Sequence, residues 1–581
     1  MNNLKKLFFL LNINERKRLG LLLIMILIMA LLDMIGVASI LPFMAVLTNS
    51  ILIENNFILN LIFQNSKIFG VENYSQFIFF LGLVVLILLL SSMAFKALTV
   101  YASVRFSEMR HYSINKRLME SYLRQPYSWF LNQNSSELGK TILSEVANVV
   151  SNGFIQVLEV IAKGLVAITI IILLIIINPK LALIIGLTIS FAYALVFHLS
   201  ANYLKRIGEE RLLHNELRYK LISEAFNASK AIKIAGLEKY YLDRFSISSL
   251  IYGNSTTSAE VIKQVPRFFL EAIVFGGLLL MILYFMIRTG DFQSIIPILS
   301  LYVFAGYRLM PALQQIYASL TILKFIGPSI DKLYREINNL TLITKKLDKG
   351  VISLTKTITL KDIHYSYPNS SKTTIKGINL SIPAKSIVAF TGRSGSGKTT
   401  IVDIILGLLE AQKGTLEIDG KVITKHNSRL WQRSIGYAPQ NIYLVDDTVT
   451  NNIAFGVEKK NIRQDLVEKA AKIAKLHEFV INELPNQYKT IIGENGIRLS
   501  GGQKQRIGIA RAIYCKPQVL ILDEATSALD NETEEAVMDG ITTLSKDLTI
   551  ILIAHRLDTV KKCNIIFKVE KGKIIHQGKF N

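Results

Sequence analysis

A glycine-rich segment in the second half of the chain has the residue types and spacing needed to bind phosphate. Gly392 to Thr399 fits the pattern G-x-x-x-x-G-K-[ST], with the apolar run 387–390 before it and the helix-forming run 401–409 after it. In such a strand–loop–helix, backbone N–H groups bind a triphosphate, lysine neutralises its oxygens and a hydroxyl ligates Mg²⁺. A Gly/Ser turn with a chance lysine is the alternative, which the flanking runs disfavour. The candidate nucleotide ligands are Gly392, Ser394, Gly395, Ser396, Gly397, Lys398, Thr399 and Thr400.

A pair of adjacent carboxylates follows a later apolar run. Asp523 and Glu524 come directly after Val519–Leu522 and lead into the segment 527–530. A carboxylate at a strand end can hold Mg²⁺, and its neighbour can orient or deprotonate the attacking water. Thr399, Asp523 and a glutamine discussed below are therefore the candidate metal ligands.

The run Leu-Ser-Gly-Gly-Gln at 499–503 precedes a predicted helix, 504–514. Two glycines allow close backbone approach, and a serine at a helix N-terminus can bind a γ-phosphate. The candidate ligands here are Ser500, Gly501, Gly502 and Gln503.

Taken together, these motifs resemble the nucleotide-binding domain of ATP-binding cassette (ABC) transporters, in which LSGGQ is the family signature. The resemblance covers roughly 351–581 and implies ATP and Mg²⁺ as cofactors. It also implies that Tyr367 stacks on adenine and that Gln440 meets Mg²⁺ and the attacking water. Glu524 is then catalytic, and His555 contacts the γ-phosphate.

The same resemblance extends to three further residues and to the assembly. Glu494 and Gly496 are similar to the exporter-specific loop, and Asp530 to the interdomain aspartate. Taken alone, Tyr367 could be an ordinary strand aromatic, and Gln440 a solvated amide. Because the family closes the signature of one domain over the phosphate loop of another, the resemblance implies a homodimer. A heterodimer stays open as the alternative.

The first three-fifths of the chain must place this ATPase at a membrane. Half of the 581 residues are hydrophobic, and the mean hydropathy is +0.36. Each predicted span has at least the roughly 20 apolar residues that cross a bilayer. The six predicted spans are 19–48, 76–104, 153–177, 181–204, 264–288 and 293–325.

The net charge of +22 lies mainly in loops on one side of these spans. Lys and Arg gather before the first span and in the long segments near 105–150 and 201–265, whereas the short connections carry very few. This positive-inside pattern places both termini and both long loops in the cytoplasm and disfavours a nucleic-acid partner. The first apolar run is too long for a cleaved signal peptide. A multi-pass membrane protein is therefore expected, and its short loops and the lack of a disulfide framework, with only two cysteines, fit a bacterial inner membrane.

The predicted fold is a membrane all-α six-helix domain followed by an α/β P-loop ATPase domain, the architecture of ABC exporters. The expected boundaries are 1–330 for the membrane domain, 331–350 for a linker and 351–581 for the ATPase domain. Short β-rich runs alternating with helical runs predict a largely parallel sheet, and Asp419-Gly420 predicts an added hairpin.

Aromatic residues within the cytoplasmic loops predict contacts with another domain. Tyr127, Trp129 and Phe130 lie in the first long loop, and an apolar group between 234 and 241 lies in the second. An interfacial anchor on lipid headgroups is the alternative. After the first span, 51–63 predicts an external amphipathic helix.

Charged residues within the spans bear on the cargo, because they are costly in a bilayer. Lys96, Arg267 and Arg308 would form a cationic belt for a phosphate or diphosphate headgroup if they face one cavity. Alternatively, they snorkel or pair with Asp33, Glu159 or Glu271.

The segments 264–267 and 307–311, which contain Pro266 and Pro311, are similar to segments of bacterial lipid-linked oligosaccharide flippases. This resemblance implies an amphipathic or lipid-linked substrate. The alternatives are a multidrug or peptide exporter and a non-transport ATPase anchored by its helices.

Overall fold

The structure is a computed structural model that describes residues 3–48, 53, 57–177, 179–289, 296–340, 350–368, 370, 372–544, 547–554 and 560–579. The chain divides into two compact units. One comprises Met1–Gln125 with Gln133–Ile343, and the other Pro126–Asn132 with Thr344–Asn581. The tip of the first cytoplasmic loop, which carries Tyr127, therefore packs with the C-terminal half of the chain.

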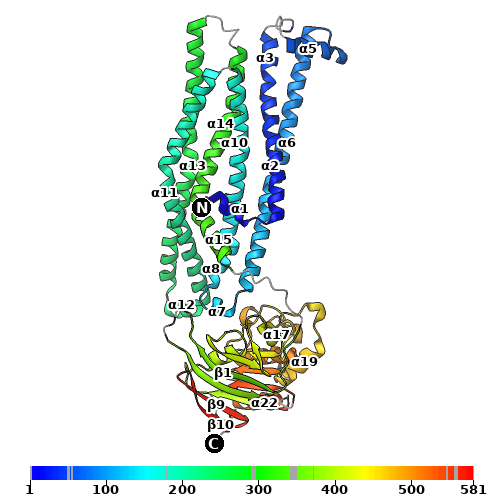
Figure 1. The fold of residues 1–581 in the computed structure, drawn as a ribbon, viewed down its shortest axis with the longest axis vertical. Coiled ribbons are helices and arrows are strands. Elements are labelled where there is room, and N and C mark those ends of the chain that lie inside the picture. Colours follow the sequence, from blue (N-terminus) through cyan, green and yellow to red (C-terminus); the bar gives the residue numbers. More distant parts are fainter. Residues whose placement is uncertain are drawn as a thin grey trace. The chain divides into compact units, whose positions relative to one another are not determined.

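The N-terminal unit is built from long helices (Figure 1). They are α1 (Asn3–Leu10), α2 (Ile13–Ala38), α3 (Ile40–Thr48), α5 (Phe57–Ser66), α6 (Tyr74–Leu123), α8 (Ser135–Lys140), α10 (Ile155–Ile177), α11 (Pro179–Asn227), α12 (Ser229–Ala235), α13 (Glu238–Thr289), α14 (Ile296–Phe325) and α15 (Gly327–Asn339). The six predicted apolar segments fall, apart from end residues, in α2–α3, α6, α10, α11, α13 and α14. The described end of the predicted external helix, residues 57–63, lies in α5.

Several of these helices have the length and apolar composition of membrane spans. Among the described residues, Ile13–Leu47, Tyr74–Leu123 and Ser135–Ile177 meet this test, and Val303–Phe325 with Gly327–Asn339, bent by 53°, would add a fourth. Apolar side chains of α2, α10 and α14, including Met29, Ile170 and Ala305, pack into one core.

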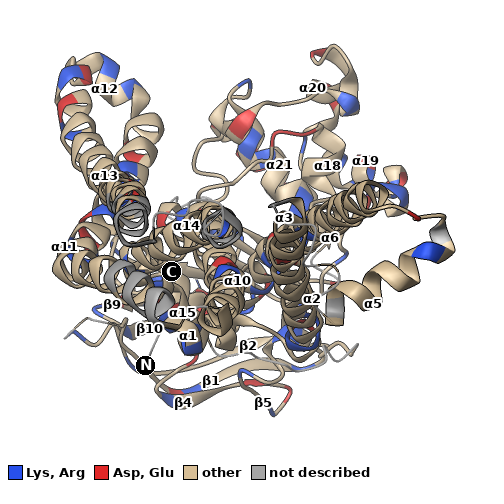
Figure 2. Ribbon diagram, turned by 90° about the horizontal axis from the view of Figure 1, so that it is seen from above, with Lys and Arg blue, Asp and Glu red and all other residues tan. Residues whose placement is uncertain are grey.

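The helices continue well beyond the apolar segments into the two long loops that the sequence predicts to be cytoplasmic. α6 runs to Leu123, α11 runs to Asn227, and α13 begins at Glu238. Figure 2 shows Lys and Arg at the turn around α12, which joins α11 to α13. Charged residues cover these extensions because they lie outside the hydrocarbon layer.

The predicted linker begins within a helix. α15 covers Gly327–Asn339, so 331–339 is helical and belongs to the N-terminal unit. Ile330 and Leu333 are 0% and 1% exposed. These two apolar side chains, one turn apart, fix α15 on the unit despite its many charges.

The C-terminal unit contains two sheets. The larger has the order β10-β9-β3-β8-β7-β6, with all neighbours parallel except the β9–β10 hairpin. Its strands are β3 (Ile387–Thr391), β6 (Ile435–Ala438), β7 (Val519–Asp523), β8 (Thr549–Ile553), β9 (Ile565–Glu570) and β10 (Lys573–Gly578). The predicted, largely parallel sheet is confirmed, and the apolar runs 387–390 and 519–522 lie in β3 and β7.

The smaller sheet is antiparallel, with the order β2-β1-β4-β5. It comprises β1 (Thr357–Tyr365), β2 (Ile375–Pro383), β4 (Lys413–Ile418) and β5 (Lys421–Ile423). The β4–β5 turn at Asp419-Gly420, with φ of 51° and 81°, is the predicted hairpin. Helices α16 (Lys398–Ile405), α21 (Gly501–Tyr514) and α22 (Asn531–Leu544) belong to the same unit. Because β3 and β7 run parallel, the residues after them meet at one sheet edge.

Candidate functional site

The phosphate loop connects β3 to α16 and has a backbone that requires glycine at two positions. Gly392 and Gly397 have φ of 144° and 109°. A Cβ on Gly392 would lie 2.2 Å from the Val569 carbonyl oxygen, and one on Gly397 would lie 2.9 Å from the Ile375 side chain. The loop therefore fits closely against β9 and β2 and presents its backbone at the start of α16.

The β9–β10 turn supports this loop. The Gly572 N–H donates to the Ser396 carbonyl at 3.0 Å, and the Lys376 N–H donates to the Gly572 carbonyl at 2.9 Å. A Cβ on Gly572 would lie 2.0 Å from the Thr374 carbonyl oxygen. Sequence reasoning missed Gly572, although a Lys-Gly pair between two β-rich runs is a turn signal.

Two side chains of the loop fit a phosphate group. The Lys398 ammonium donates to the carbonyls of Gly392 and Arg393 at 2.9 and 3.0 Å. Burial lowers the pKa of Lys398, while Glu524 and Asp523 oppose that shift. The Ser396 hydroxyl is buried and has no hydrogen-bond partner among the described residues. Phosphate oxygens would supply acceptors to both groups, so the loop fits a nucleotide.

Asp523 ends β7 as a buried carboxylate beside the loop. Burial, followed by the charge of Glu524, raises its pKa to about 6. The Tyr437 hydroxyl donates to Asp523 at 3.5 Å. Asp403, on α16, is a second buried carboxylate, and burial with the charge of Asp523 raises its pKa to about 6. Sequence reasoning missed Asp403, although a carboxylate inside an apolar helix is unusual.

The structure brings Glu524 and Gln440 together. The Gln440 amide donates to the Glu524 carboxylate at 2.7 Å. Glu524 has a φ of 49° and follows the end of β7, so its side chain leaves the sheet at a strained turn. Its N–H donates to the Ile553 carbonyl at 3.2 Å. His555 lies outside the described residues.

The predicted adenine contact, Tyr367, lies against the phosphate-loop helix. Its hydroxyl shares a hydrogen bond of 3.0 Å with Thr400, next to the exposed Thr399. Its ring meets Tyr365 edge-on, with centroids 5.2 Å apart. Burial raises the pKa of Tyr127, and electrostatic interactions with Asp403 and Tyr367 raise it further. The loop tip therefore lies near this end of the site.

The signature segment begins α21 with a reciprocal cap. The Ser500 hydroxyl accepts from the Gln503 N–H at 3.2 Å, and the Ser500 N–H donates to the Gln503 side chain at 2.8 Å. A Cβ on Gly502 would lie 3.1 Å from the Ala528 carbonyl. Ser500 and Gly501 are exposed. The cap thus presents a helix N-terminus at the surface, where it can bind an anion.

The residues after the carboxylates are linked to the signature helix. The Gln505 side chain donates to the Ser527 hydroxyl at 3.0 Å and accepts from the Ala528 N–H at 2.8 Å. Asp530 caps the helix α22 by accepting from the Thr533 N–H at 2.9 Å. Glu494 and Gly496 form a short turn. Sequence reasoning missed Gln505, two residues beyond the signature.

In the membrane unit, Asp33 brings two of the three predicted basic residues together. Asp33 is 2% exposed and accepts from Arg308 at 2.8 Å and from Ser92 at 2.7 Å. The Lys96 ammonium lies 3.9 Å from the same carboxylate. Arg267 instead pairs with Glu271, one turn along α13, at 2.6 Å and is half exposed. The structure thus joins Lys96 to Arg308 and places Arg267 in a separate pair.

Comparisons with known proteins identify the family. The family model "ABC transporter" matches residues 375–527, and the model "ABC transporter transmembrane region" matches 21–310. A protein of Saccharophagus degradans, described as "ATP-dependent lipid A-core flippase", is 30% identical over 478 residues, which are 80% of this chain and 78% of that protein. The chain belongs to the ABC transporters.

Other matches agree on the type of ABC transporter. A second "ATP-dependent lipid A-core flippase", from Wigglesworthia glossinidia brevipalpis, is 29% identical over 81% of this chain and 80% of its own length. A solved bacterial Atm1-family ABC exporter with ATP bound has a TM-score of 0.78 and 20% identity, covering 97% of this chain and 95% of that one. This ABC transporter is an exporter-type half-transporter and an ATP-dependent translocase.

Proposed function

We propose that this ABC transporter is a homodimer that uses Mg²⁺ and ATP to flip a lipid-linked oligosaccharide, or another anionic lipid, across a bacterial inner membrane. The observation that carries the choice of cargo is the cluster of Lys96 and Arg308 around buried Asp33. The flippase relatives named above also favour a lipid.

The geometry of the ATPase domain, taken as 351–581, supports the proposed nucleotide roles. The phosphate loop and Lys398 bind the triphosphate. When bound, Mg²⁺ supplies positive charge to the β/γ-phosphates, and Thr399, Asp523 and Gln440 would hold it. Glu524, oriented by Gln440 at 2.7 Å, takes the proton of the attacking water. We retain His555 as the proposed γ-phosphate contact and Tyr367 as the adenine contact.

The homodimer completes each ATP site with the signature of the other copy. Ser500 and Gly501 are exposed at the start of α21, where they can meet a γ-phosphate. The second cytoplasmic loop is also available for docking, because Ile234 and Tyr240 near α12 are 78% and 54% exposed. Exposed apolar side chains on a charged helical turn indicate an interface.

The intramembrane cluster suits a phosphate-bearing headgroup. Lys96 interacts electrostatically with two other basic residues, Lys163 and Arg308, and with the carboxylates of Asp33 and Glu159. Asp33 satisfies the cations when no cargo is bound. An incoming phosphate would compete for Arg308, which binds oxyanions through several donors. Arg267, next to Glu271, remains a weaker candidate for cargo contact.

The test is transport in proteoliposomes that contain the purified protein and a fluorescent polyprenyl-diphosphate-linked glycan. ATP should deplete the label from the leaflet next to the ATPase domain, and Glu524→Gln should abolish this depletion. Lys96→Gln with Arg308→Gln should reduce transport more than basal ATP hydrolysis. Undiminished transport by this double variant contradicts the assignment of the cluster.

A multidrug exporter is the second candidate, because buried Asp33 could also attract a cationic compound. Stimulation of ATP hydrolysis by hydrophobic cations, with none by the diphosphate lipid, favours that function.

A further inference from the structure

The last helix of the membrane unit, α15, connects the span α14 to the ATPase domain along the chain. α15 ends at Asn339, and the N-terminal unit ends at Ile343. Helix α15 is bent by 53° from the preceding helix, Val303–Phe325. The ATPase domain therefore follows α15 in the chain.

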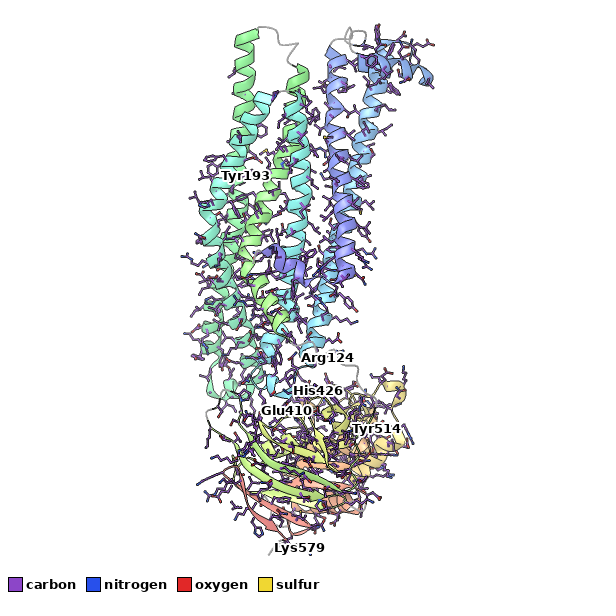
Figure 3. All side chains as sticks on the ribbon, viewed as in Figure 1. Arg124, Tyr193, Glu410, His426, Tyr514 and Lys579 are labelled. Carbon is purple, nitrogen blue, oxygen red and sulfur yellow. The ribbon has the colours of Figure 1, made fainter. Side chains whose placement is uncertain are left out.

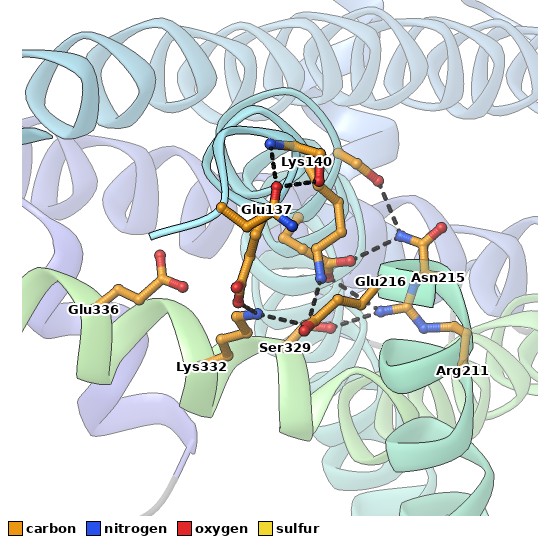
Figure 4. Close-up of polar contacts among 12 residues, drawn as sticks. Glu137, Lys140, Arg211, Asn215, Glu216, Ser329, Lys332 and Glu336 are labelled. Carbon is orange, nitrogen blue, oxygen red and sulfur yellow. Dashed lines mark hydrogen bonds and ion pairs between the residues drawn. The ribbon is translucent and has the colours of Figure 1, made fainter. Parts of the chain in front are cut away.

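One side of α15 is held by charged residues of the two cytoplasmic extensions (Figure 4). The Lys332 ammonium lies 2.6 Å from Glu137, on α8, and 2.9 Å from Glu216, on α11. Glu216 also accepts from Lys140 at 3.1 Å, and Lys140 is 0% exposed. A buried lysine needs such a partner, so the geometry of these four groups is closely constrained.

One turn before Lys332, a second set of contacts continues the same network. The buried Arg211 guanidinium donates to the Ser329 hydroxyl at 2.6 Å and to Glu145 at 3.3 Å. Asn215 donates to Glu145 at 3.0 Å. Figure 4 shows these side chains of α11 directed toward α15 and toward the segment after α8.

Other residues of α15 contact α1 and α6. Asp331 pairs with Lys6 at 2.5 Å, and Tyr334 meets Phe9 edge-on, with ring centroids 5.0 Å apart. The Tyr122 hydroxyl donates to Glu336 at 2.6 Å. Within 13 residues, α15 is thus joined through side chains to α1, α6, α8 and α11. The roles assigned above to ATP and cargo residues do not use these contacts.

We propose that α15 is a coupling helix that moves as one rigid body with the cytoplasmic parts of α6, α8 and α11. Lys332 is then a positioning residue, because it holds the two cytoplasmic extensions on the helix that leads to the ATPase domain. Apolar contacts alone could hold α15, but they tolerate sliding, whereas buried ion pairs and hydrogen bonds have defined geometry. ATP-driven motion then reaches the spans through α15 as well as through the loop tips.

Hydrogen–deuterium exchange of the full-length transporter tests this coupling, comparing the nucleotide-free protein with the protein trapped by ATP and vanadate. In the wild type, exchange should change both in phosphate-loop peptides and in the 74–90 part of α6. In Lys332→Met, the phosphate-loop change should persist, while the α6 change should fall at least about threefold. No cargo is needed, so failure of this result is distinct from failure of the proposed flippase activity.

Two further variants separate coupling from general stability. Lys332→Arg keeps a positive charge between Glu137 and Glu216 and should retain the wild-type α6 change. Lys220→Met removes an exposed pair on α11, in which Lys220 lies 3.8 Å from Glu224, and should change nothing. A wild-type α6 response in Lys332→Met overturns the proposal. If Lys332→Met does not fold, Glu137→Gln, which removes the pair between α8 and α15, takes its place, and a wild-type α6 response in that folded variant overturns the proposal.

Discussion

The ATP site and the Asp33 cluster place charge next to a candidate anion site in different ways. In the ATPase domain, Ser396 is buried without a partner among the described residues, and Lys398 donates to backbone carbonyls. In the membrane unit, Asp33 already neutralises Arg308 and lies near Lys96. The ATP site is thus arranged for an anion from outside the chain, whereas the membrane cluster contains its own anion.

This difference explains how specific each site can be. A phosphate entering the ATP site meets the Ser396 hydroxyl, a buried donor without an acceptor among the described residues, so binding there satisfies a polar group. A headgroup entering the membrane cluster must displace Asp33 from Arg308, so only a ligand with strong negative charge gains by binding. Competition between Asp33 and the headgroup for Arg308 would therefore make the cargo site selective.

The largest expected effect tests the ATP site. Glu524→Gln should lower Mg²⁺-dependent ATP hydrolysis by at least about 100-fold, because it removes the general base. Binding of a fluorescent ATP analogue should be retained. Glu532→Gln, on the exposed surface of α22, is the matched control. Near wild-type hydrolysis by Glu524→Gln would mean that another residue activates the water.

The next prediction concerns Asp33, the carboxylate within the membrane cluster. Arg308→Gln should destabilise the protein by about 3–5 kcal/mol, because it leaves Asp33 buried without its closest cation. Thermal unfolding of the purified protein measures the loss, and adding Asp33→Asn should restore most of it. Arg267→Gln breaks a half-exposed pair and should cost at most about 1 kcal/mol. Equal losses for Arg267→Gln and Arg308→Gln would remove the distinction between the two pairs.

A smaller effect concerns the support of the phosphate loop. Gly572→Ala should weaken ATP binding by about 1–3 kcal/mol, because the new Cβ clashes with Thr374 at a φ of 79°. Gly456 has the same φ, but a Cβ added there would meet no atom within 4 Å, so Gly456→Ala isolates backbone strain. Affinity measured for both variants should fall only for Gly572→Ala.

The smallest effect depends on pH. Asp403 and Asp523 have a pKa of about 6 in the folded protein, against an ordinary value of 3.8. The folded state therefore binds more protons than the unfolded state between about pH 4 and 6, so stability falls as pH rises through that window. Asp403→Asn should raise the unfolding temperature of the nucleotide-free protein at pH 8 but not at pH 4.5.

The control for this pH effect is Asp547→Asn, at an exposed position. Its unfolding temperature should differ from the wild type by the same small amount at both pH values. A gain for Asp403→Asn that is equal at pH 8 and pH 4.5 would show that burial of this charge is not the cause.

The sequence predicts the ATP site better than the membrane clusters. Gly392 to Thr399 and Asp523-Glu524 follow strands, and parallel strands bring their ends to one edge, so local patterns suffice. Figure 3 shows the densely packed side chains of this domain, which include the buried Tyr514. Lys332 and Glu137, in contrast, are 195 positions apart, and no local pattern pairs them.

The same reasoning accounts for the other residues that were missed or misplaced. Lys96 and Arg267 both lie within apolar runs, but which side of a helix a charge occupies depends on tertiary packing, which the sequence does not give. Gly572 and Asp403 matter through contacts with β2 and β7, which appear only after folding. Sequence periodicity specifies elements, whereas partners across elements require the structure.

The most direct test of the proposed cargo compares two labelled lipids in the same proteoliposomes. One is a polyprenyl-diphosphate-linked glycan, and the other is a glycolipid with the same sugars and no phosphate. We expect ATP-dependent movement of the diphosphate lipid alone, lost when Lys96 and Arg308 are both replaced by Gln. Equal movement of both lipids, or movement of neither with an active ATPase, contradicts the proposed cargo.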